Sequence, residues 1–214
     1  MKVSPTMNRW LEQVVEQAGQ VRGFLAPDEG ERLYRMASEA CRLGPCLEIG
    51  SYCGKSALYL GRACKENGQV LFSIDHHRGS EEQQPGEEYF DIALFDARHY
   101  RIDTFPHFLR TLELADLVGS VIPIVATSTL VARSWATPLA LVFIDGGHAL
   151  ETVQGDYDGW ARHVMPGGYL LFDDIFPDPA QGGQAPYIVY QAAIASGQFH
   201  ELPMTGTLGV LQRK

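Results

Sequence analysis

Short apolar runs alternate with amphipathic stretches along most of the chain, and this alternation constrains the fold more than any other feature. The runs CLEI, QVLFSI, VIPIVA, LALVFI and GYLLF are short and rich in Leu, Ile, Val and Phe, as buried strands are. Between them, apolar residues recur at helical spacing in residues 56–67, 104–117, 130–135 and 150–164. Such alternation is typical of βαβ units in a parallel, doubly wound sheet.

The two ends of the chain complete this prediction. Apolar residues at helical spacing, such as Leu11, Val14 and Ala18, predict N-terminal helices within residues 1–44. At the other end a helical stretch, YIVYQAAIASG, precedes the strand-like runs FHELPM and TLGVLQR. Their tight connection predicts a hairpin. The sequence therefore predicts a single α/β domain over residues 1–214, with a seven-stranded, mostly parallel Rossmann-like sheet and one antiparallel edge strand.

One connection is unusually long. More than forty residues separate Asp75 from Val121, whereas βα and αβ loops commonly take about 2 to 6 residues each. Residues 104–117 supply one helix, which leaves residues 76–103 as a polar, acidic and aromatic segment. We expect this segment to be a lid or substrate loop, or else a solvated excursion.

Charge and cysteine usage exclude several classes of function. The formal net charge is −9 and Lys and Arg are not clustered, so nucleic acid and anionic membrane are not expected as partners. The cysteines form no C-x-x-C pair, the first residues lack a signal-peptide core, and no apolar run approaches the ~20 residues that span a bilayer. We expect a cytoplasmic protein, with a homodimer as its default assembly.

The stretch LEIGSYCGKS contains a glycine turn, which raises the question of its ligand. A P-loop needs four residues between its glycines, but only three separate Gly50 from Gly54. A dinucleotide fingerprint counted from Gly50 needs glycines where Tyr52 and Lys55 stand. The turn still lets backbone approach a ligand, and Asp75 can accept both hydroxyls of a ribose. A nucleoside without phosphates fits this pattern better than a dinucleotide.

Polar side chains follow the predicted strands. In an open α/β sheet, ligands bind at the carboxyl ends of the strands. An Asp at one strand end is commonly a turn former, but several at one rim predict a ligand site. The residues concerned are Glu48, Asp75, Ser128, Asp145, Asp173 and Asp174.

LEIGSYCGKSAL resembles the first motif of the class I S-adenosylmethionine-dependent methyltransferases, in the metal-dependent catechol O-methyltransferase-like branch. The likeness continues through most of the chain from Cys46 onward. The resemblance implies that the ribose is held by Asp75 and that the adenine lies near Ser128 and His76. The residues that it places around the methionine part of the cofactor are Glu48, Gly50, Ser51, Tyr52 and Ser56.

The stretches FIDGGH and LLFDD are similar to the metal-binding motifs of that branch. The resemblance assigns Asp145, Asp173 and Asp174 to a divalent cation, and carboxylate ligands favour Mg²⁺ or Mn²⁺ over zinc. Catechol enzymes have a lysine base three residues after the first metal aspartate, whereas this chain has His148. Histidine there resembles the macrolide-sugar methyltransferases, so we expect Asp145 and His148 to be the catalytic pair acting on a saccharide hydroxyl. A histidine with an ordinary pKa near ~6.5 is neutral at physiological pH and can serve as the base.

Two further stretches, DHHRGSEE and FPDPAQGGQAPY, are similar to a subgroup that includes the enzyme methylating mycobacterial methylmannose polysaccharide. Alternatives remain at this point: a catechol-type acceptor, a catalytically silent nucleoside-binding protein, and a metal phosphoesterase built on the DHH stretch at residues 75–77. Phosphoesterases of the last kind need upstream acidic motifs and a second domain, and we expect neither from this sequence. His148 can also be an ordinary hydrogen-bonded histidine of the structure.

Overall fold

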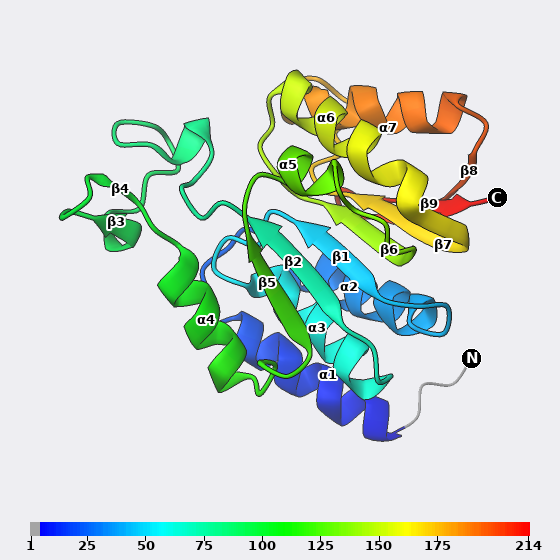
Figure 1. Ribbon diagram of the computed structural model, residues 1–214, viewed down its shortest axis with the longest axis horizontal. Helices are drawn as coiled ribbons and strands as arrows, with labels where there is room; N and C mark the ends of the chain where they lie inside the picture. The colour runs from blue at the N-terminus through cyan, green and yellow to red at the C-terminus, as the bar shows by residue number, and fades with distance from the viewer. Residues whose placement is uncertain (1–4) are drawn as a thin grey trace.

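A computed structural model describes the backbone of residues 5–214 and the side chains of residues 12–214. Residues 1–4 and the side chain of Leu11, which belong to the predicted N-terminal features, lie outside the described part. A seven-stranded sheet runs through the middle of the molecule with helices on both faces (Figure 1). Its strands are β1 (Cys46–Ile49), β2 (Leu71–Asp75), β5 (Val121–Val125), β6 (Leu139–Ile144), β7 (Val164–Phe172), β8 (Phe199–Thr205) and β9 (Leu208–Arg213).

The strand order is β5-β2-β1-β6-β7-β9-β8, and the first five strands are mutually parallel. β9 is antiparallel to both of its neighbours, and β8 is the outermost strand on that side. The predicted α/β fold, with its mostly parallel seven-stranded sheet and C-terminal hairpin, is confirmed. The antiparallel strand itself lies one position inside the edge.

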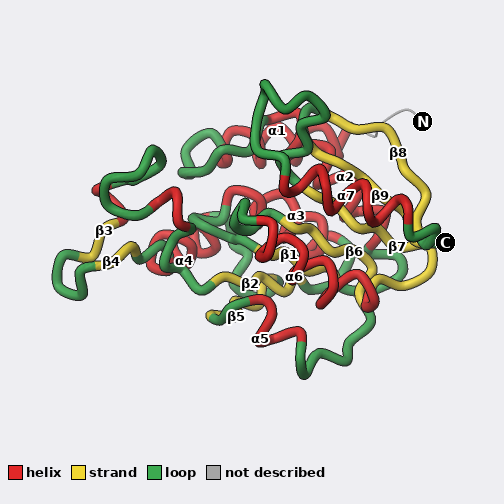
Figure 2. Tube along the Cα trace, turned by 90° about the horizontal axis from the view of Figure 1, so that it is seen from above, coloured by secondary structure: helices red, strands yellow, loops and turns green. Residues whose placement is uncertain are grey.

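The helices form two layers, which lie below and above the sheet in Figure 1 and overlap in Figure 2, where the molecule is seen from above. One layer contains α1 (Pro5–Ala18), α2 (Pro27–Ala40), α3 (Lys55–Glu66) and α4 (Phe105–Leu114), and the other contains α5 (Ser128–Ala132), α6 (Leu150–Trp160) and α7 (Ala185–Ala195). Because neighbouring strand residues point to opposite faces, Leu141 and Phe143 pack in the core of the first layer, while Val142 and Ile144 pack in that of the second. Both faces of β6 are therefore buried, as its continuous apolar run predicts.

Residues 76–103, which we call the lid segment, extend away from the sheet at the left of Figure 1. The segment contains two 3₁₀ turns, Glu81–Gln83 and Ile92–Leu94, and a small hairpin of β3 (Phe95–Asp96) and β4 (Arg101–Ile102). Leu94 and Ile102 are buried in a small cluster of their own with Cys53. The segment is thus a folded excursion with its own apolar anchor.

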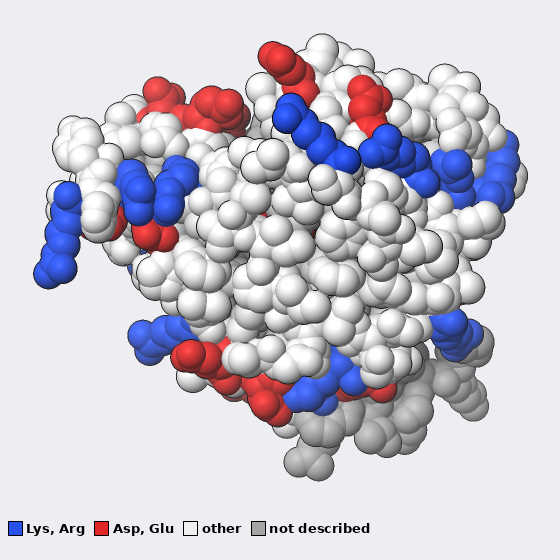
Figure 3. All heavy atoms as spheres, viewed as in Figure 1, with Lys and Arg blue, Asp and Glu red and all other residues white. Residues whose placement is uncertain are grey.

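Surface charge is uneven on the face shown in Figure 3. Lys, Arg, Asp and Glu lie mainly at the margins of this face, and its central area carries none of them.

In the part of the chain that the structure describes, no helix has both the length and the apolar character needed to cross a membrane.

Candidate functional site

The parallel strands align their last residues into one row. Ile49 of β1 pairs with Ile74 of β2 and with Ile144 of β6, and Ile144 pairs with Phe172 of β7. The next residue of each strand or loop therefore falls on a common line across the rim of the sheet. These next residues are Gly50, Asp75, Asp145 and Asp173.

Gly50 is required where the chain leaves β1. Its φ of 91° is in the left-handed region, and a Cβ at this position would lie 1.8 Å from the carbonyl oxygen of Asp145. Because glycine has no side chain, two neighbouring strand ends can approach each other closely. The loop then reaches α3 through Gly54, which is the N-cap of that helix and has a φ of 92°.

Asp75 is held by the backbone on both sides. Its Oδ2 accepts a hydrogen bond from the Tyr52 amide at 2.8 Å, and its Oδ1 accepts one from the His77 amide at 2.7 Å. Tyr52 and His77 both have positive φ values, 46° and 58°, which turn these amides toward the carboxylate. Asp75 is thus fixed in orientation while it lines the cavity described below.

Glu48 lies behind the cavity wall. It is fully buried, and its carboxylate accepts hydrogen bonds from Ser56 at 2.8 Å and from Ser73 at 2.5 Å. Ser73 Oγ also lies 2.7 Å from Ser51 Oγ. Burial raises the pKa of Glu48 to about 7, against the effect of the two hydroxyl donors. Glu48 therefore braces Ser51 and Ser56, which do line the cavity, from beneath.

A cavity of about 1110 Å³ opens along this rim. This volume is of the size that holds a nucleoside-containing cofactor together with a small acceptor. The residues predicted for cofactor binding that line it are Gly50, Ser51, Tyr52, Ser56, Asp75, His76 and Ser128. All of the predicted cofactor residues except Glu48 therefore line this one cavity, and we call the part of it that they form the cofactor wall.

Ser128 is the first residue of α5, and its hydroxyl donates a hydrogen bond to Asp156 of α6. Burial raises the pKa of Asp156 to about 6, against the effect of the Ser128 hydroxyl. Asp156 also lines the cavity, and sequence reasoning missed it. The signal available was an acid within an otherwise apolar helical face, which is a weak signal because acids are common on helices.

Asp145, Asp173 and Asp174 line the same cavity close to the cofactor wall. Burial raises the pKa of Asp145, and the negative charges of Asp173 and Asp174 raise it further. Burial and the charge of Asp174 likewise raise the pKa of Asp173 to about 7. Like charges held together in this way favour either a shared proton or a bound cation.

His148 lies between two carboxylates. Its Nε2 is 2.9 Å from Asp174 Oδ2, and its Nδ1 is 3.1 Å from Glu82 Oε2 of the lid segment. Hydrogen bonding to Asp174 is the largest cause that raises the pKa of His148 to about 9. Because two carboxylates hold the ring, the pKa of His148 lies above the ordinary histidine value that the sequence suggested.

In chemistry, although not in position, the donor set of Asp145, Asp173 and Asp174 fits a hard divalent cation. Its ligand atoms are all carboxylate oxygens, and Asp173 Oδ1 is buried without a hydrogen-bond partner. The three carboxylates do not converge on a single point. We compared the distances between the ligand atoms of Asp, Glu, His and Cys side chains among residues 12–214. Only one group of three has all of its ligand atoms within 4.8 Å of one another, and that group consists of cysteines. Asp174, which has a φ of 56°, is instead turned toward His148.

The loop before α2 also borders the cavity, and sequence reasoning did not assign it to the site. Arg22 Nε lies 2.8 Å from Asp91 Oδ2 of the lid segment, and the ring of Phe24 packs edge-on against Tyr89 at 5.3 Å. Lys55 Nζ donates to the Gly23 carbonyl at 2.8 Å. No local motif reveals these contacts, because each joins residues that are far apart in the chain.

The DHH stretch does not present a ligand set. His77 is buried, its Nδ1 lies 2.7 Å from Thr104 Oγ1, and its ring packs against Phe105 and Phe108. His76 instead lies exposed at the cavity rim. His77 does not line the cavity that Asp75 and His76 line, and the structure gives no support to the phosphoesterase alternative.

A family model described as a methyltransferase domain matches residues 47–175. The chain therefore belongs to this methyltransferase family. The solved structure of the O-methyltransferase NovP is similar over 97% of this chain and 99% of that one, with a TM-score of 0.72 and 15% identity. The O-methyltransferase TomG from Streptomyces achromogenes, in complex with SAM, is similar over 100% of this chain and 91% of that one, with a TM-score of 0.63 and 15% identity.

An O-methyltransferase from Bacillus cereus, in complex with SAH, is also similar, over 96% of this chain and 91% of that one, with a TM-score of 0.61 and 15% identity. At such identities the likeness is one of fold. The predicted resemblance to class I methyltransferases is confirmed at the level of family and fold.

Proposed function

We propose that this protein transfers the methyl group of S-adenosylmethionine to a hydroxyl oxygen of a small molecule, with a saccharide as the favoured acceptor. The observation that carries the proposal is the arrangement of a single cavity. A fixed Asp75 carboxylate suited to ribose hydroxyls lines one part of it, and Asp145, Asp173 and His148 line another. The O-methyltransferases with the same fold support the choice of oxygen as the acceptor atom.

Some residues at the cofactor wall contact the cofactor, and others hold those residues in place. Asp75 accepts hydrogen bonds from the two ribose hydroxyls. Ser51 and Ser56 face the methionine part, and Glu48 supports them from the side away from the cavity. Gly50 keeps that loop close to the strand end of β6. The sulfonium methyl is thereby directed toward the part of the cavity where His148 lies.

The chemistry is a displacement at carbon. The bond from sulfur to the methyl carbon breaks as the bond from the acceptor oxygen to that carbon forms, and the products are S-adenosylhomocysteine and a methyl ether. The hydroxyl proton passes to His148 Nε2, which acts as the general base. Asp145, Asp173 and Asp174 would hold a divalent cation, which when bound supplies positive charge that lowers the pKa of the acceptor hydroxyl.

His148 must lose its own proton before it can act as a base. Asp174 is the main partner that retains this proton, so a turn of Asp174 away from the ring lowers the pKa of His148. Glu82 is on the lid segment, so its distance from the imidazole changes with the position of that segment. The resting ion pair of His148 is consistent with a base that is released when the site is filled.

The first prediction tests activity and metal dependence together. Labelled methyl transfer from S-adenosylmethionine into a panel of saccharides and catechols should occur with Mg²⁺ or Mn²⁺ and should stop in excess chelator. Asp145→Ala with Asp173→Ala should abolish turnover, whereas Asp158→Ala, at an exposed position of α6, should not.

Three results, two from that assay and one from calorimetry with S-adenosylhomocysteine, would contradict parts of the proposal. Full turnover in excess chelator removes the cation. Transfer confined to catechols replaces the saccharide with the catechol-type alternative. Binding of S-adenosylhomocysteine without transfer to any acceptor would favour a silent nucleoside-binding protein.

A further inference from the structure

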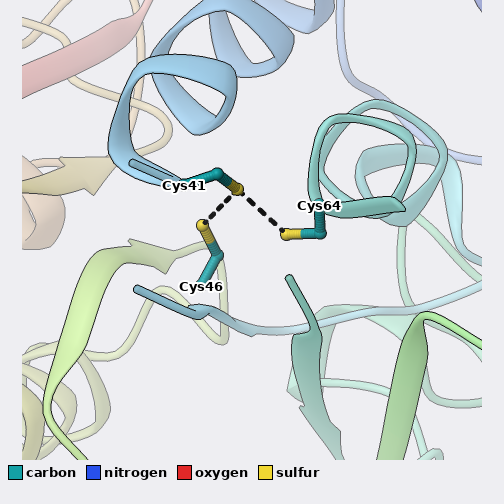
Figure 4. A group of neighbouring side chains, drawn as sticks. All are labelled: Cys41, Cys46 and Cys64. Carbon is teal, nitrogen blue, oxygen red and sulfur yellow. Dashed lines mark hydrogen bonds between the residues drawn. The ribbon is translucent and has the colours of Figure 1, made fainter. Parts of the chain in front are cut away.

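Three of the four cysteines meet at the opposite end of β1 from the candidate site. Cys46 is the first residue of β1, Cys41 is the C-cap of α2, and Cys64 lies in the last turn of α3. Their side chains point toward one another from three different elements (Figure 4). The cluster plays no part in the proposed methyl transfer.

The sulfur atoms are already spaced for a shared ligand. Cys41 Sγ lies 3.9 Å from Cys46 Sγ and 3.7 Å from Cys64 Sγ, and all three sulfurs lie within 4.8 Å of one another. Three sulfurs arranged in a plane around one ion at a metal–sulfur length of about 2.3 Å stand about 4.0 Å apart. A disulfide needs about 2.05 Å, so the sulfurs are not bonded to one another, and the two distances from Cys41 are close to those of a ligand triangle.

The surroundings decide the kind of ion. Cys46 and Cys64 are fully buried and Cys41 is 3% exposed, in a core cluster that also contains Ala37, Ala63 and other apolar residues. The set includes no carboxylate or imidazole. Thiolates alone select soft ions, and a closed zinc site requires a fourth ligand. A soft ion that accepts three sulfur ligands fits the cluster best.

We propose that Cys41, Cys46 and Cys64 form a binding site for one soft, thiophilic metal ion of the Cu⁺ type. The ion would tie the end of α2 and the end of α3 to the start of β1. The other ends of β1 and α3 carry Gly50 and Gly54, which bound the cofactor loop. The site is therefore placed to stabilise the base of that loop.

Binding balances through proton release. Each cysteine that ligates the ion as a thiolate gives up its thiol proton to solvent as the metal–sulfur bond forms. The ion keeps its oxidation state, so no oxidant or reductant is needed.

The test uses the reduced full-length protein under anaerobic conditions and the metal ion alone. Cd²⁺ serves as a spectroscopic probe, because sulfur-to-cadmium charge transfer gives an ultraviolet absorption band. Cu⁺ is measured by competition with a chromogenic chelator, and proton release is measured in weak buffer. Cys41→Ala, Cys46→Ala and Cys64→Ala are compared with Cys53→Ala, which removes the buried cysteine that lies outside the cluster.

We expect one ion per chain in the wild type and in Cys53→Ala, with thiol protons released to solvent as either ion binds. Each cluster variant should bind at least tenfold more weakly. A ligand that binds only the folded state also raises the thermal midpoint, and this rise should be lost in the cluster variants. Should a buried variant fail to fold, Cys41→Ser at the helix end provides the same comparison. Wild-type protein that binds neither ion, or equal binding in Cys64→Ala and wild type, would overturn the proposal.

Discussion

Asp75 combines a ligand-facing role with a role in holding its own loop. Asp75→Ala removes the acceptor of the Tyr52 and His77 amides as well as the proposed partner of the ribose hydroxyls. Hydrogen bonds to a charged group contribute about 1.5 to 3 kcal/mol each. We expect the affinity for S-adenosylhomocysteine, measured by calorimetry, to drop at least tenfold. Asp158→Ala is the matched control, and unchanged affinity in folded Asp75→Ala would remove the assignment.

His148 carries the proposed proton transfer. His148→Ala should keep cofactor binding and lower turnover by about 10²- to 10⁴-fold, the usual contribution of a general base. Because Asp174 and Glu82 raise the pKa of His148, the base form appears as pH rises from 6.5 toward about 9, and the wild-type rate should rise over that range. His200→Ala, an exposed histidine on β8, is the control. Near-normal turnover in His148→Ala would leave His148 as a structural residue.

Strand geometry accounts for three of the acidic residues that were predicted at the site. Asp75, Asp145 and Asp173 follow directly from the ends of parallel strands, so their place on one rim was predictable. The pairing of His148 with Glu82 was not, because 66 positions separate the two residues and no periodicity links them. The position of Glu48 behind the wall was also unpredictable, since it depends on hydroxyls from two other elements.

At the scale of elements, the lid segment is attached to the loop before α2 by two exposed contacts. The Arg22–Asp91 ion pair contributes about 0 to 1 kcal/mol and the Phe24–Tyr89 aromatic pair about 0.5 to 1.5 kcal/mol. Removing both in Arg22→Ala with Phe24→Ala should speed hydrogen exchange across residues 76–103 by roughly 3- to 50-fold. Mass spectrometry of deuterium uptake measures this change.

The same segment provides its own control for that prediction. Tyr100 is an exposed aromatic residue whose ring packs against Phe95 within the segment and not against the loop before α2. Tyr100→Ala should leave exchange across the rest of residues 76–103 close to that of the wild type. Equal exchange in the wild type and the Arg22 and Phe24 double variant would show that the loop does not hold the lid segment.

Element boundaries were predictable where apolar runs are long enough to show a period. CLEI matches β1, LALVFI matches β6, and the helix expected over residues 104–117 is α4. Within the lid segment, β3 and β4 have two residues each and the 3₁₀ turns have three, too few for any period to appear. That segment is shaped by burial of Leu94 and Ile102, which is a tertiary effect.

At the scale of the whole molecule, buried acidic groups at the site make the free energy of unfolding depend on pH. Burial raises the pKa of Glu48 to about 7 and that of Asp156 to about 6, from ordinary values of 4.5 and 3.8. At a pH between the ordinary and the raised pKa, the folded state therefore binds more protons than the unfolded state. This proton binding stabilises the folded state. Its contribution is fully present below the ordinary pKa values and is lost as pH rises through the raised pKa values. His77 acts in the opposite sense, because burial lowers its pKa.

The substitution Glu48→Gln separates the contribution of Glu48 to the pH dependence of stability from those of Asp156 and His77. Glutamine keeps the shape and one hydrogen-bonding oxygen of Glu48 but cannot ionise. The ligand-free wild type should lose free energy of unfolding between pH 5 and pH 8, and Glu48→Gln should lose less, by about 1 to 3 kcal/mol. Urea unfolding at the two pH values measures this difference, and the contribution of His77 cancels in the comparison. Glu113→Gln, at an exposed position of α4, should behave as the wild type. Identical pH dependence in the wild type and Glu48→Gln would contradict the prediction. It would mean that the Glu48 carboxyl ionises in the folded protein as it does in the unfolded one, which requires that water reaches it behind the cofactor wall.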